Sequence, residues 1–426
     1  MQARATDRQQ AVTESGGHPM LDVSRGLEAL LSPVSREVFL KEYWEAKPLL
    51  IERKASCFYD GLFSAHDLDQ LISYSEMSYP TIRAVQNGKP EQSLAFARAP
   101  LSSDQLVNQI TAAYDLYADG YTIVLSGIQR GSRQVRHLCR FLEAELSHPV
   151  TVNAYATPKG SQGFSAHYDD HDILILQIEG SKHWEVSPPH NELPLEWHPP
   201  NEQDQLREPY LTTMLEAGDM LYLPRGWNHA GRASEAASLH LTVGIFVYRW
   251  ADFIQQAVRD VCDKDIRFRR ALPPGFLKEG TPSEFLREHL KELLGALESE
   301  ADAGAAQSTM ARRLLRRSEP TAEKRLGEIN SSSEINIETD LEKPAAMRCQ
   351  VLPVGAHCSV YFPGGELRMP GKTTEALRFI SEREGAFTGR QIPGPLRESE
   401  VLVLLRRLMK EGLLQRSAHP PASEAG

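Results

Sequence analysis

Two histidines and one aspartate are spaced so that they could hold a single metal ion. His167 and Asp169 lie two residues apart in SAHYDDHD, just before the apolar run Ile173–Ile178. In an extended chain the side chains of residues i and i+2 leave the same face, so this pair can bind one ion together. His229 follows 60 residues after Asp169, at the end of GDMLYLPRGWNH, where a strand runs into a Pro/Gly turn. Two histidines and one carboxylate leave open positions for a co-substrate and dioxygen, as in non-haem Fe(II) oxygenases.

The spacing alone leaves other ligand sets open. Asp169 and His171 are separated in the same way as the first pair, and His240 lies in the alternating strand SLHLT. His240 is therefore either a polar residue that lines a barrel or a rival third ligand. A zinc ion with a bound water uses the same ligand types. An isolated HxD pair also arises by chance in solvated loops, so the metal site needs support from the rest of the chain.

The elements around these residues change in character along the chain. Residues 1–20 are polar and are expected to form a disordered lead-in to a first folded domain over 21–250. Up to about residue 150 apolar residues recur at helical spacing, with one short strand expected at Lys47–Ile51. From 150 to 250 short apolar runs alternate with Gly, Pro, Asn and Asp, which predicts a β-rich core of the jelly-roll type. The expected strands are Val150–Tyr155, Ile173–Ile178, Trp184–Val186, Met220–Leu223 and Leu239–Val247.

The second half of the chain is expected to contain two smaller parts. Helical spacing returns after Trp250, and TPSE at 281–284 has the residues of a capped helix start, so 251–330 should be helical. A serine-rich, charged stretch at 331–344 is interpreted as a linker. Residues 345–416 should form a last folded part with helices at Thr374–Ser381 and Ser399–Glu411, followed by a tail at 417–426.

Composition limits the class of protein. The chain has 426 residues, of which 41% are hydrophobic and 24% charged, so two or three globular domains are expected. No apolar run is long enough for a membrane span, and the N-terminus lacks the apolar core of a signal peptide, so we expect a cytoplasmic protein without a membrane partner. Five scattered cysteines without a CxxC pair indicate reduced thiols. The net charge of −10 argues against general nucleic-acid affinity and suits a basic protein partner.

Three sequence blocks carry a family resemblance. The runs SQGFSAHYDDHDILILQIEGSKHWEV, GDMLYLPRGWNHAG and FLKEYWEAKPLLIER resemble the JmjC-type Fe(II)/2-oxoglutarate oxygenases. They stand in the order and spacing of the ribosomal-oxygenase, cupin-like branch, which includes bifunctional lysine demethylases and histidyl or arginyl hydroxylases. The resemblance implies that His167, Asp169 and His229 are the iron ligands. It also implies an α+β fold: a double-stranded β-helix, with a helical dimerisation region and a C-terminal winged helix.

The resemblance also implies 2-oxoglutarate and O2 as co-substrates. The distal carboxylate of 2-oxoglutarate needs a cation or several donors when it is buried. Lys182, fifteen residues after His167, stands at the family's position for this basic partner, although a turn lysine is the simpler interpretation of the residue alone. Asn153 and Tyr155 alternate on their expected strand, so both can face the same pocket.

These features together predict an Fe(II)- and 2-oxoglutarate-dependent protein hydroxylase. By resemblance its substrate is an arginine or histidine side chain of a ribosomal protein, and the enzyme is a homodimer. Two alternatives stay open: lysine demethylation by the same chemistry, and a non-catalytic metal-binding or protein-interaction module. The expected recognition helix of the winged helix, Glu398–Glu411, mixes basic and acidic residues, so direct nucleic-acid binding is not expected.

Overall fold

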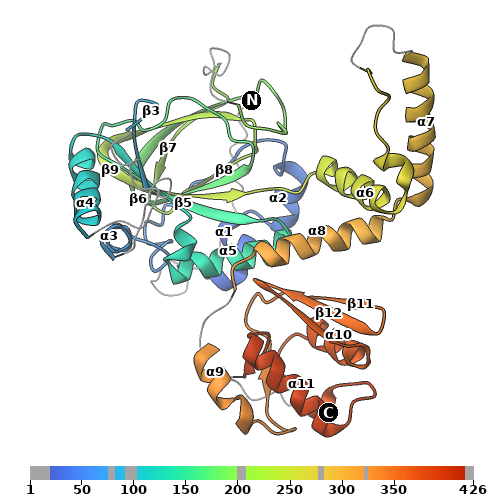
Figure 1. Cartoon of the computed structure of the whole chain (residues 1–426). Helices are drawn as coiled ribbons and strands as arrows, with labels where there is room; N and C mark the ends of the chain where they lie inside the picture. The colour runs from blue at the N-terminus through green and yellow to red at the C-terminus, as the bar shows by residue number, and fades with distance from the viewer. Residues whose placement is uncertain are drawn as a thin grey trace. The chain divides into compact units, whose positions relative to one another are not determined.

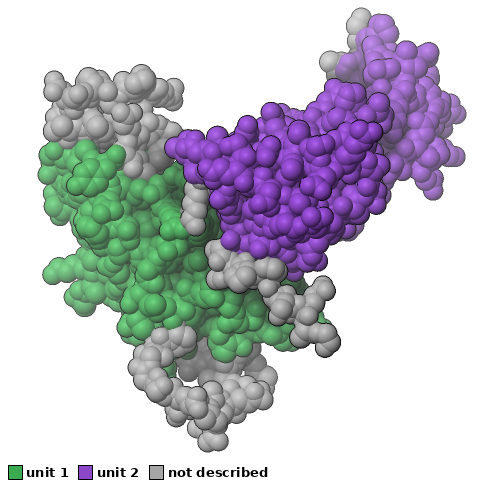
Figure 2. Space-filling model, turned by 90° about the horizontal axis from the view of Figure 1, so that it is seen from below, with its two compact units in different colours: residues 1–139, 151–245 green, residues 140–150, 246–426 purple. Residues whose placement is uncertain are grey.

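The computed structural model describes residues 20–74, 82–91, 103–198, 208–276, 283–320 and 325–417. It divides into two compact units: residues 1–139 with 151–245, and residues 140–150 with 246–426 (Figure 2). The expected lead-in and tail lie outside the described residues, except for Met20 and Ser417. Among the described residues, no helix is both long and apolar enough to span a membrane.

The first unit is built on one nine-stranded sheet whose recorded pairings are all antiparallel. β6 and β9 are its longest strands, and they pair from Asp172 opposite Ile245 to Ser187 opposite Asn228. Figure 1 shows these strands curving around a common interior. In spatial order the strands are β1 (Leu49–Ile51), β8 (Met220–Leu223), β6 (Asp172–Ser187), β9 (Asn228–Ile245), β5 (Val150–Thr157), β4 (Thr122–Ser126), β2 (Ile82–Gln86) and β3 (Lys89–Pro90), and β7 (Leu211–Glu216) pairs with β6.

The observed strands differ from the expected ones in three ways. The runs expected as separate strands at Ile173–Ile178 and Trp184–Val186 are one strand, β6, because two register shifts let its pairing with β9 continue through Gly180. β9 begins at Asn228 rather than at Leu239, since polar and small residues also join the ladder there. β2 and β4 lie in a region expected to be helical with a single strand. Their apolar runs are short, and in such short runs periodicity alone does not distinguish a buried strand from a helix.

Helices precede the central strands of this unit. α4 packs against β2 and β4, and α5, whose residues from Arg140 onward belong to the second unit, has Val135, Leu138 and Leu142 buried. The hydroxyl of Ser35 caps α2 by accepting a hydrogen bond from the Val38 N–H at 3.3 Å. The helices are α1 (Gly26–Leu31), α2 (Arg36–Glu42), α3 (Ala65–Tyr74), α4 (Ser103–Ala118) and α5 (Arg133–Leu146).

An apolar cluster fills the interior between β6, β7 and β8. Ile173 and Ile175 at the start of β6 pack with Leu221 and Leu223 of β8, all of them almost fully buried. The cluster extends to Trp184, Val186, Leu215 and Trp227. It fixes both ends of β6, and the metal-ligand candidates stand beside it.

The second unit combines helices with small sheets. α6 packs on α7 and α8, α8 contacts β12 and β13, and α9 contacts α11. β12 is the middle strand of a three-stranded sheet, and β10 pairs with β14. The elements are α6 (Trp250–Lys264), α7 (Ser283–Glu300), α8 (Ala303–Arg317), α9 (Arg325–Ser331), β10 (Leu341–Glu342), β11 (Gln350–Val354), β12 (His357–Phe362), β13 (Gly365–Pro370), α10 (Thr374–Glu382), α11 (Glu398–Glu411) and β14 (Gln415–Arg416).

The stretch expected to be a linker at 331–344 is packed instead. Ile335, Ile337 and Leu341 are buried in the core formed with α10 and α11. These three apolar residues stand among serines and charged residues, so the composition of the stretch gave no indication that it is buried. The residues that bury it are distant in sequence. Thr281 and Pro282 of the expected helix start lie outside the described residues, and α7 begins at Ser283.

Gly180 gives a stability prediction because it lies at the register shift of β6 with φ +65°. A Cβ at this position would overlap the carbonyl oxygen of Ala237, so Gly180→Ala should cost about 3 kcal/mol of unfolding free energy. Gly160 is the matched control, since its φ is +68° but nothing lies within 4 Å of a Cβ there. Gly160→Ala should cost only about 1 kcal/mol. Urea unfolding of both variants measures the difference, and equal losses would contradict a clash at Gly180.

Candidate metal centre

The structure brings His167, Asp169 and His229 together. His167 lies before β6 and pairs with His229 of β9 through two backbone hydrogen bonds of 3.2 and 2.9 Å. One ligand atom from each of the three side chains lies within 4.8 Å of the others, and the His229 Nε2 is 3.8 Å from an Asp169 oxygen. Among the described residues this is the one group of three or more His, Cys, Asp or Glu side chains that meets this distance.

Backbone carbonyls orient both imidazole rings. The Nδ1 of His167 lies 2.9 Å from the carbonyl oxygen of Ser165, and the Nδ1 of His229 lies 3.1 Å from that of Trp227. A carbonyl only accepts hydrogen bonds, so each Nδ1 carries the proton. The lone pair is therefore on Nε2 of both rings, the atom available to a metal.

The charges of the three groups suit a divalent cation. Burial, reinforced by the neighbouring His167, lowers the pKa of His229 to about 4, so this imidazole is neutral at pH 7. Burial alone would raise the pKa of Asp169, but His171, His167 and His229 outweigh it and hold the pKa below its ordinary value. The cluster thus combines a carboxylate with neutral imidazole, the protonation states that metal ligands require.

A buried ion pair holds the turn between β8 and β9. Asp172 is fully buried and accepts hydrogen bonds from the backbone N–H of Arg225 at 2.9 Å and from its guanidinium at 3.3 Å. The same guanidinium reaches Glu45 at 2.6 Å, and Arg225 is itself buried. The N–H of Gly226 donates to the carbonyl oxygen of Asp169 at 2.9 Å. The turn that leads into His229 is therefore bonded directly to the backbone of Asp169.

The rival ligands occupy other positions. His171 lies with its Nδ1 3.1 Å from Asp170, and both residues line the same cavity as the three clustered side chains. His240 is buried with its ring stacked on Tyr155 at 4.8 Å and edge-on to Trp184 at 5.4 Å. Tyr168, between the two residues of the HxD pair, accepts a hydrogen bond from the His198 N–H and is absent from the cavity lining.

The three side chains share a cavity of about 560 Å³ with Lys182, Asn153 and Tyr155. Lys182 is 4% exposed, and its ammonium donates to the Thr157 hydroxyl at 3.1 Å and lies 5.4 Å from the Trp184 ring. No carboxylate of the described residues pairs with it, and burial lowers its pKa to about 7. A buried cation without an anionic partner fits a ligand that supplies a carboxylate.

Asn153 and Tyr155 face this cavity from alternate positions of β5. Asn153 accepts a hydrogen bond from the Gly127 N–H at 3.1 Å, which fixes its amide. Burial raises the pKa of Tyr155, and the nearby Asp169 adds to this, so the hydroxyl keeps its proton. The phenol can therefore donate to a bound ligand.

Trp184 and Gly231 also line the cavity but were not candidate site residues, whereas His240 was expected either to line a barrel or to be a rival ligand. Trp184 leaves its indole N–H without a partner among the described residues, and so does the Nδ1 of His240. A Cβ on Gly231 would come within 3.0 Å of the Trp184 ring and 2.9 Å of the Lys182 side chain, so glycine is needed to leave space beside the ammonium. Only the alternation of SLHLT pointed to the strand that carries His240.

Comparison with known proteins agrees with this geometry. A family described as "JmjC domain" matches residues 126–253, which contain the three clustered side chains and Lys182. The chain contains a JmjC domain over these residues. It is similar to ribosomal oxygenase 1 of Danio rerio, with 31% identity over 72% of this chain and 59% of the relative. Human ribosomal oxygenase 1 is 34% identical over 60% of this chain and 40% of that protein. Both findings agree with the resemblance carried by the three sequence blocks.

A solved structure supports the fold over most of the chain. The ribosomal oxygenase YcfD from Escherichia coli, in complex with cobalt and 2-oxoglutarate, superposes with a TM-score of 0.56 at 18% identity. The match covers 90% of this chain and 98% of that one, so the JmjC cupin fold with mixed helix and sheet is shown. The chain spans roughly half the length of the curated relatives it matches, from 59% for the Danio rerio protein to 40% for the human one.

The buried Lys182 predicts a pH-dependent stability of the protein without metal or ligand. Its folded pKa of about 7 lies below the ordinary 10.5, so the unfolded chain binds more protons between these values. The unfolding free energy of the wild type should therefore rise with pH in this window. Lys182→Met has no ionisable group at this position. The unfolding free energy of the variant minus that of the wild type should therefore fall by about 3 kcal/mol between about pH 6.5 and about pH 9.5.

Urea unfolding at both pH values measures this change. Lys159→Met, which removes an exposed lysine, serves as the reference for the loss of one surface charge. A stability difference between Lys182→Met and the wild type that stays constant across the window would show that the ammonium is not buried in the way described.

Proposed function

We propose that this protein is an Fe(II)- and 2-oxoglutarate-dependent protein hydroxylase. The observation that carries the proposal is that one cavity is lined by the cluster of His167, Asp169 and His229 and also by the ammonium of Lys182, with which no carboxylate of the described residues pairs. Nitrogen and carboxylate ligands on one side of an ion are the arrangement of non-haem Fe(II) oxygenases. A ligand that binds the metal at one end and carries a carboxylate at the other fits the positive charge of Lys182.

Each residue has a defined task in this proposal. His167, Asp169 and His229 would hold the metal, and Lys182 would pair with the distal carboxylate of 2-oxoglutarate, supported by Asn153 and Tyr155. When bound, iron with 2-oxoglutarate and O2 supplies the oxidation that inserts one oxygen atom into a substrate C–H bond, with succinate and CO2 as co-products.

The protein contributes orientation and exclusion of water. Carbonyl oxygens of Ser165 and Trp227 keep the Nε2 atoms of His167 and His229 turned toward the metal position. The almost completely buried Lys182 and Trp184 form a wall that excludes bulk water from the co-substrate position.

The proposed substrate is an arginine or histidine side chain of a ribosomal protein. Relatives carry the names ribosomal oxygenase 1 and, in Dictyostelium discoideum, bifunctional lysine-specific demethylase and histidyl-hydroxylase NO66. The Dictyostelium protein is 33% identical over 58% of this chain. The net charge of −10 is complementary to a basic partner of this kind. A cytoplasmic location follows from such a substrate.

The second unit supports two further parts of the proposal. We infer that residues 345–416, a three-stranded sheet with α10 and α11, form a winged helix that contacts protein rather than nucleic acid. We also infer that the helices of 251–330 form a dimer contact. Apolar side chains four residues apart are exposed on α6, at Trp250 and Ile254, and on α7, at Leu290 and Leu294. Exposed apolar stripes of this kind suit a self-complementary interface.

Asp169→Ala tests the reaction. The change removes the one anionic ligand, so Co2+ binding and iron-dependent succinate formation should each fall at least about 100-fold. Wild-type enzyme should also add one oxygen atom to a ribosomal protein, located on an arginine or histidine by fragmentation mass spectrometry. Asp60→Ala, at an exposed carboxylate, is the control. Full succinate production by Asp169→Ala would refute the assignment, and loss of a methyl group from lysine would favour demethylation instead.

The dimer is tested at α7. Light scattering at micromolar concentration should give twice the chain mass of 47.6 kDa for the wild type. Leu290→Glu with Leu294→Glu places two charges on the exposed stripe and should shift the protein to the monomer. Leu326→Glu, at an 80% exposed leucine of α9, should leave the dimer intact. A wild type that is monomeric under these conditions would contradict the proposal.

A further inference from the structure

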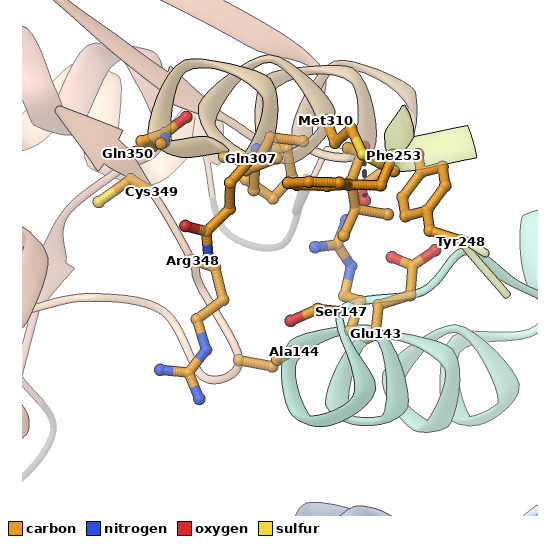
Figure 3. A pocket seen from close by; sticks show the side chains of 18 of the residues that line it. Glu143, Ala144, Ser147, Tyr248, Phe253, Gln307, Met310, Arg348, Cys349 and Gln350 are labelled. Atoms are coloured by element: carbon orange, nitrogen blue, oxygen red, sulfur yellow. Dashed lines mark hydrogen bonds between the residues drawn. The ribbon is translucent and has the colours of Figure 1, made fainter. Parts of the chain in front are cut away.

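The second unit contains a cavity of its own, of about 810 Å³ (Figure 3). Its walls come from α5, from the start of α6, from one face of α8 and from the chain that leads into β11. None of the three clustered metal-ligand candidates lines it. The volume is in the range of cavities that hold small molecules.

The floor of this cavity is apolar. Met310, Leu314 and Leu315 of α8 are less than 10% exposed and stand on the face that lines the cavity. Phe253 of α6 lies next to Met310 in the view of Figure 3. The face recurs at the i, i+4 spacing of a helix, so it offers a continuous apolar surface to a ligand.

Some buried polar atoms of the lining lack a hydrogen-bond partner among the described residues. They include the hydroxyl of Tyr248 and the side-chain oxygen of Gln350. Buried polar groups are usually paired, and an unpaired one costs free energy. Polar atoms of a bound molecule would satisfy them.

The charge of the lining is positive. Arg140, Arg249 and Arg348 line the cavity with a single carboxylate, Glu143. Glu143 already accepts a hydrogen bond from the Val150 N–H at 3.2 Å. Arg249 is paired with Asp252, which lies outside the lining.

Arg348 is the cation available to a ligand. It is exposed, and no carboxylate of the described residues pairs with it. In Figure 3 the guanidinium extends along the open side of the cavity toward Ala144 of α5. An anion at this opening would meet the positive charge of Arg348.

We propose that this cavity binds an anionic amphiphile, a small molecule with an apolar chain or ring and one carboxylate. The carboxylate pairs with Arg348 at the opening, where a guanidinium can hold it through two hydrogen bonds. The apolar body lies against Phe253, Met310 and Leu314, which removes their surface from water. This inference is independent of the metal centre.

Calorimetric titration of the full-length protein with octanoate and with 1-octanol tests the inference. The two probes share the apolar chain and differ in charge. Octanoate should bind with a stoichiometry of one and more tightly than octanol. Arg348→Ala should weaken octanoate about ten-fold and leave octanol unchanged, because only the carboxylate contacts the guanidinium. Arg368→Ala, at an exposed arginine of β13 outside the lining, should change neither.

Two variants that fill the cavity from opposite walls locate the binding site. Ala311→Phe on α8 and Ala144→Phe on α5 should each abolish binding of both probes. Because the changes lie on separate helices, a folding failure of one leaves the other as a test. The inference is overturned by absence of saturable octanoate binding, by equal affinity in Arg348→Ala, or by octanoate binding that persists in a folded filled variant. The last result would place octanoate at another site, such as the cavity of Lys182.

Discussion

The pairing of β6 with β9 is the constraint on which the metal centre depends. Along this ladder Val186 stands opposite His229, Trp184 opposite Gly231 and Lys182 opposite Ala233, so one face of two strands presents a metal-ligand candidate and the buried ammonium together. Side chains alternate between the faces of a sheet, so a slip of one residue would move His229 and Lys182 to opposite sides. The backbone bridge between His229 and His167 then places the HxD pair, which precedes β6, beside His229. Correct register, rather than any single contact, assembles the site.

The ladder is irregular in a way that the cavity requires. At the start of β6 the odd-numbered Ile173 and Ile175 line the cavity, whereas further along the even-numbered Lys182 and Trp184 do so. The two register shifts around Gly180 change this parity, since a bulge inserts an unpaired residue and re-aims the side chains that follow. The left-handed conformation of Gly180 is part of the same device. A regular strand would have turned the ammonium of Lys182 away from the metal position.

The parts of the site that depend on neighbouring residues are predictable from the sequence, and the parts that depend on distant residues are not. The HxD pair and the alternation of Asn153 and Tyr155 are local patterns of period two, and the structure places all four residues in one cavity. The sequence itself offered His229 as a third ligand, with His240 as its rival. Only resemblance decided between the two and gave Lys182 its role, because the partners of these residues are distant in sequence. Burial of Arg225 was not predicted, since its two carboxylate partners, Asp172 and Glu45, join it only through tertiary structure. The same reason hid Ile335 and Leu341, whose burial needs α10 and α11.

The first unit contains two kinds of buried charge, which have opposite effects on its stability. Asp172 and Arg225 neutralise each other and receive further hydrogen bonds from the Tyr222 hydroxyl and the Arg225 N–H, so this pair can stabilise the turn without any ligand. Lys182 has only the Thr157 hydroxyl, and its burial costs free energy for as long as no anion is bound. An anionic co-substrate would recover that cost on binding, which couples its affinity to the stability of the fold. The apolar wall makes burial of the ammonium cost free energy. The same wall makes the ammonium selective for a ligand that ends in a carboxylate.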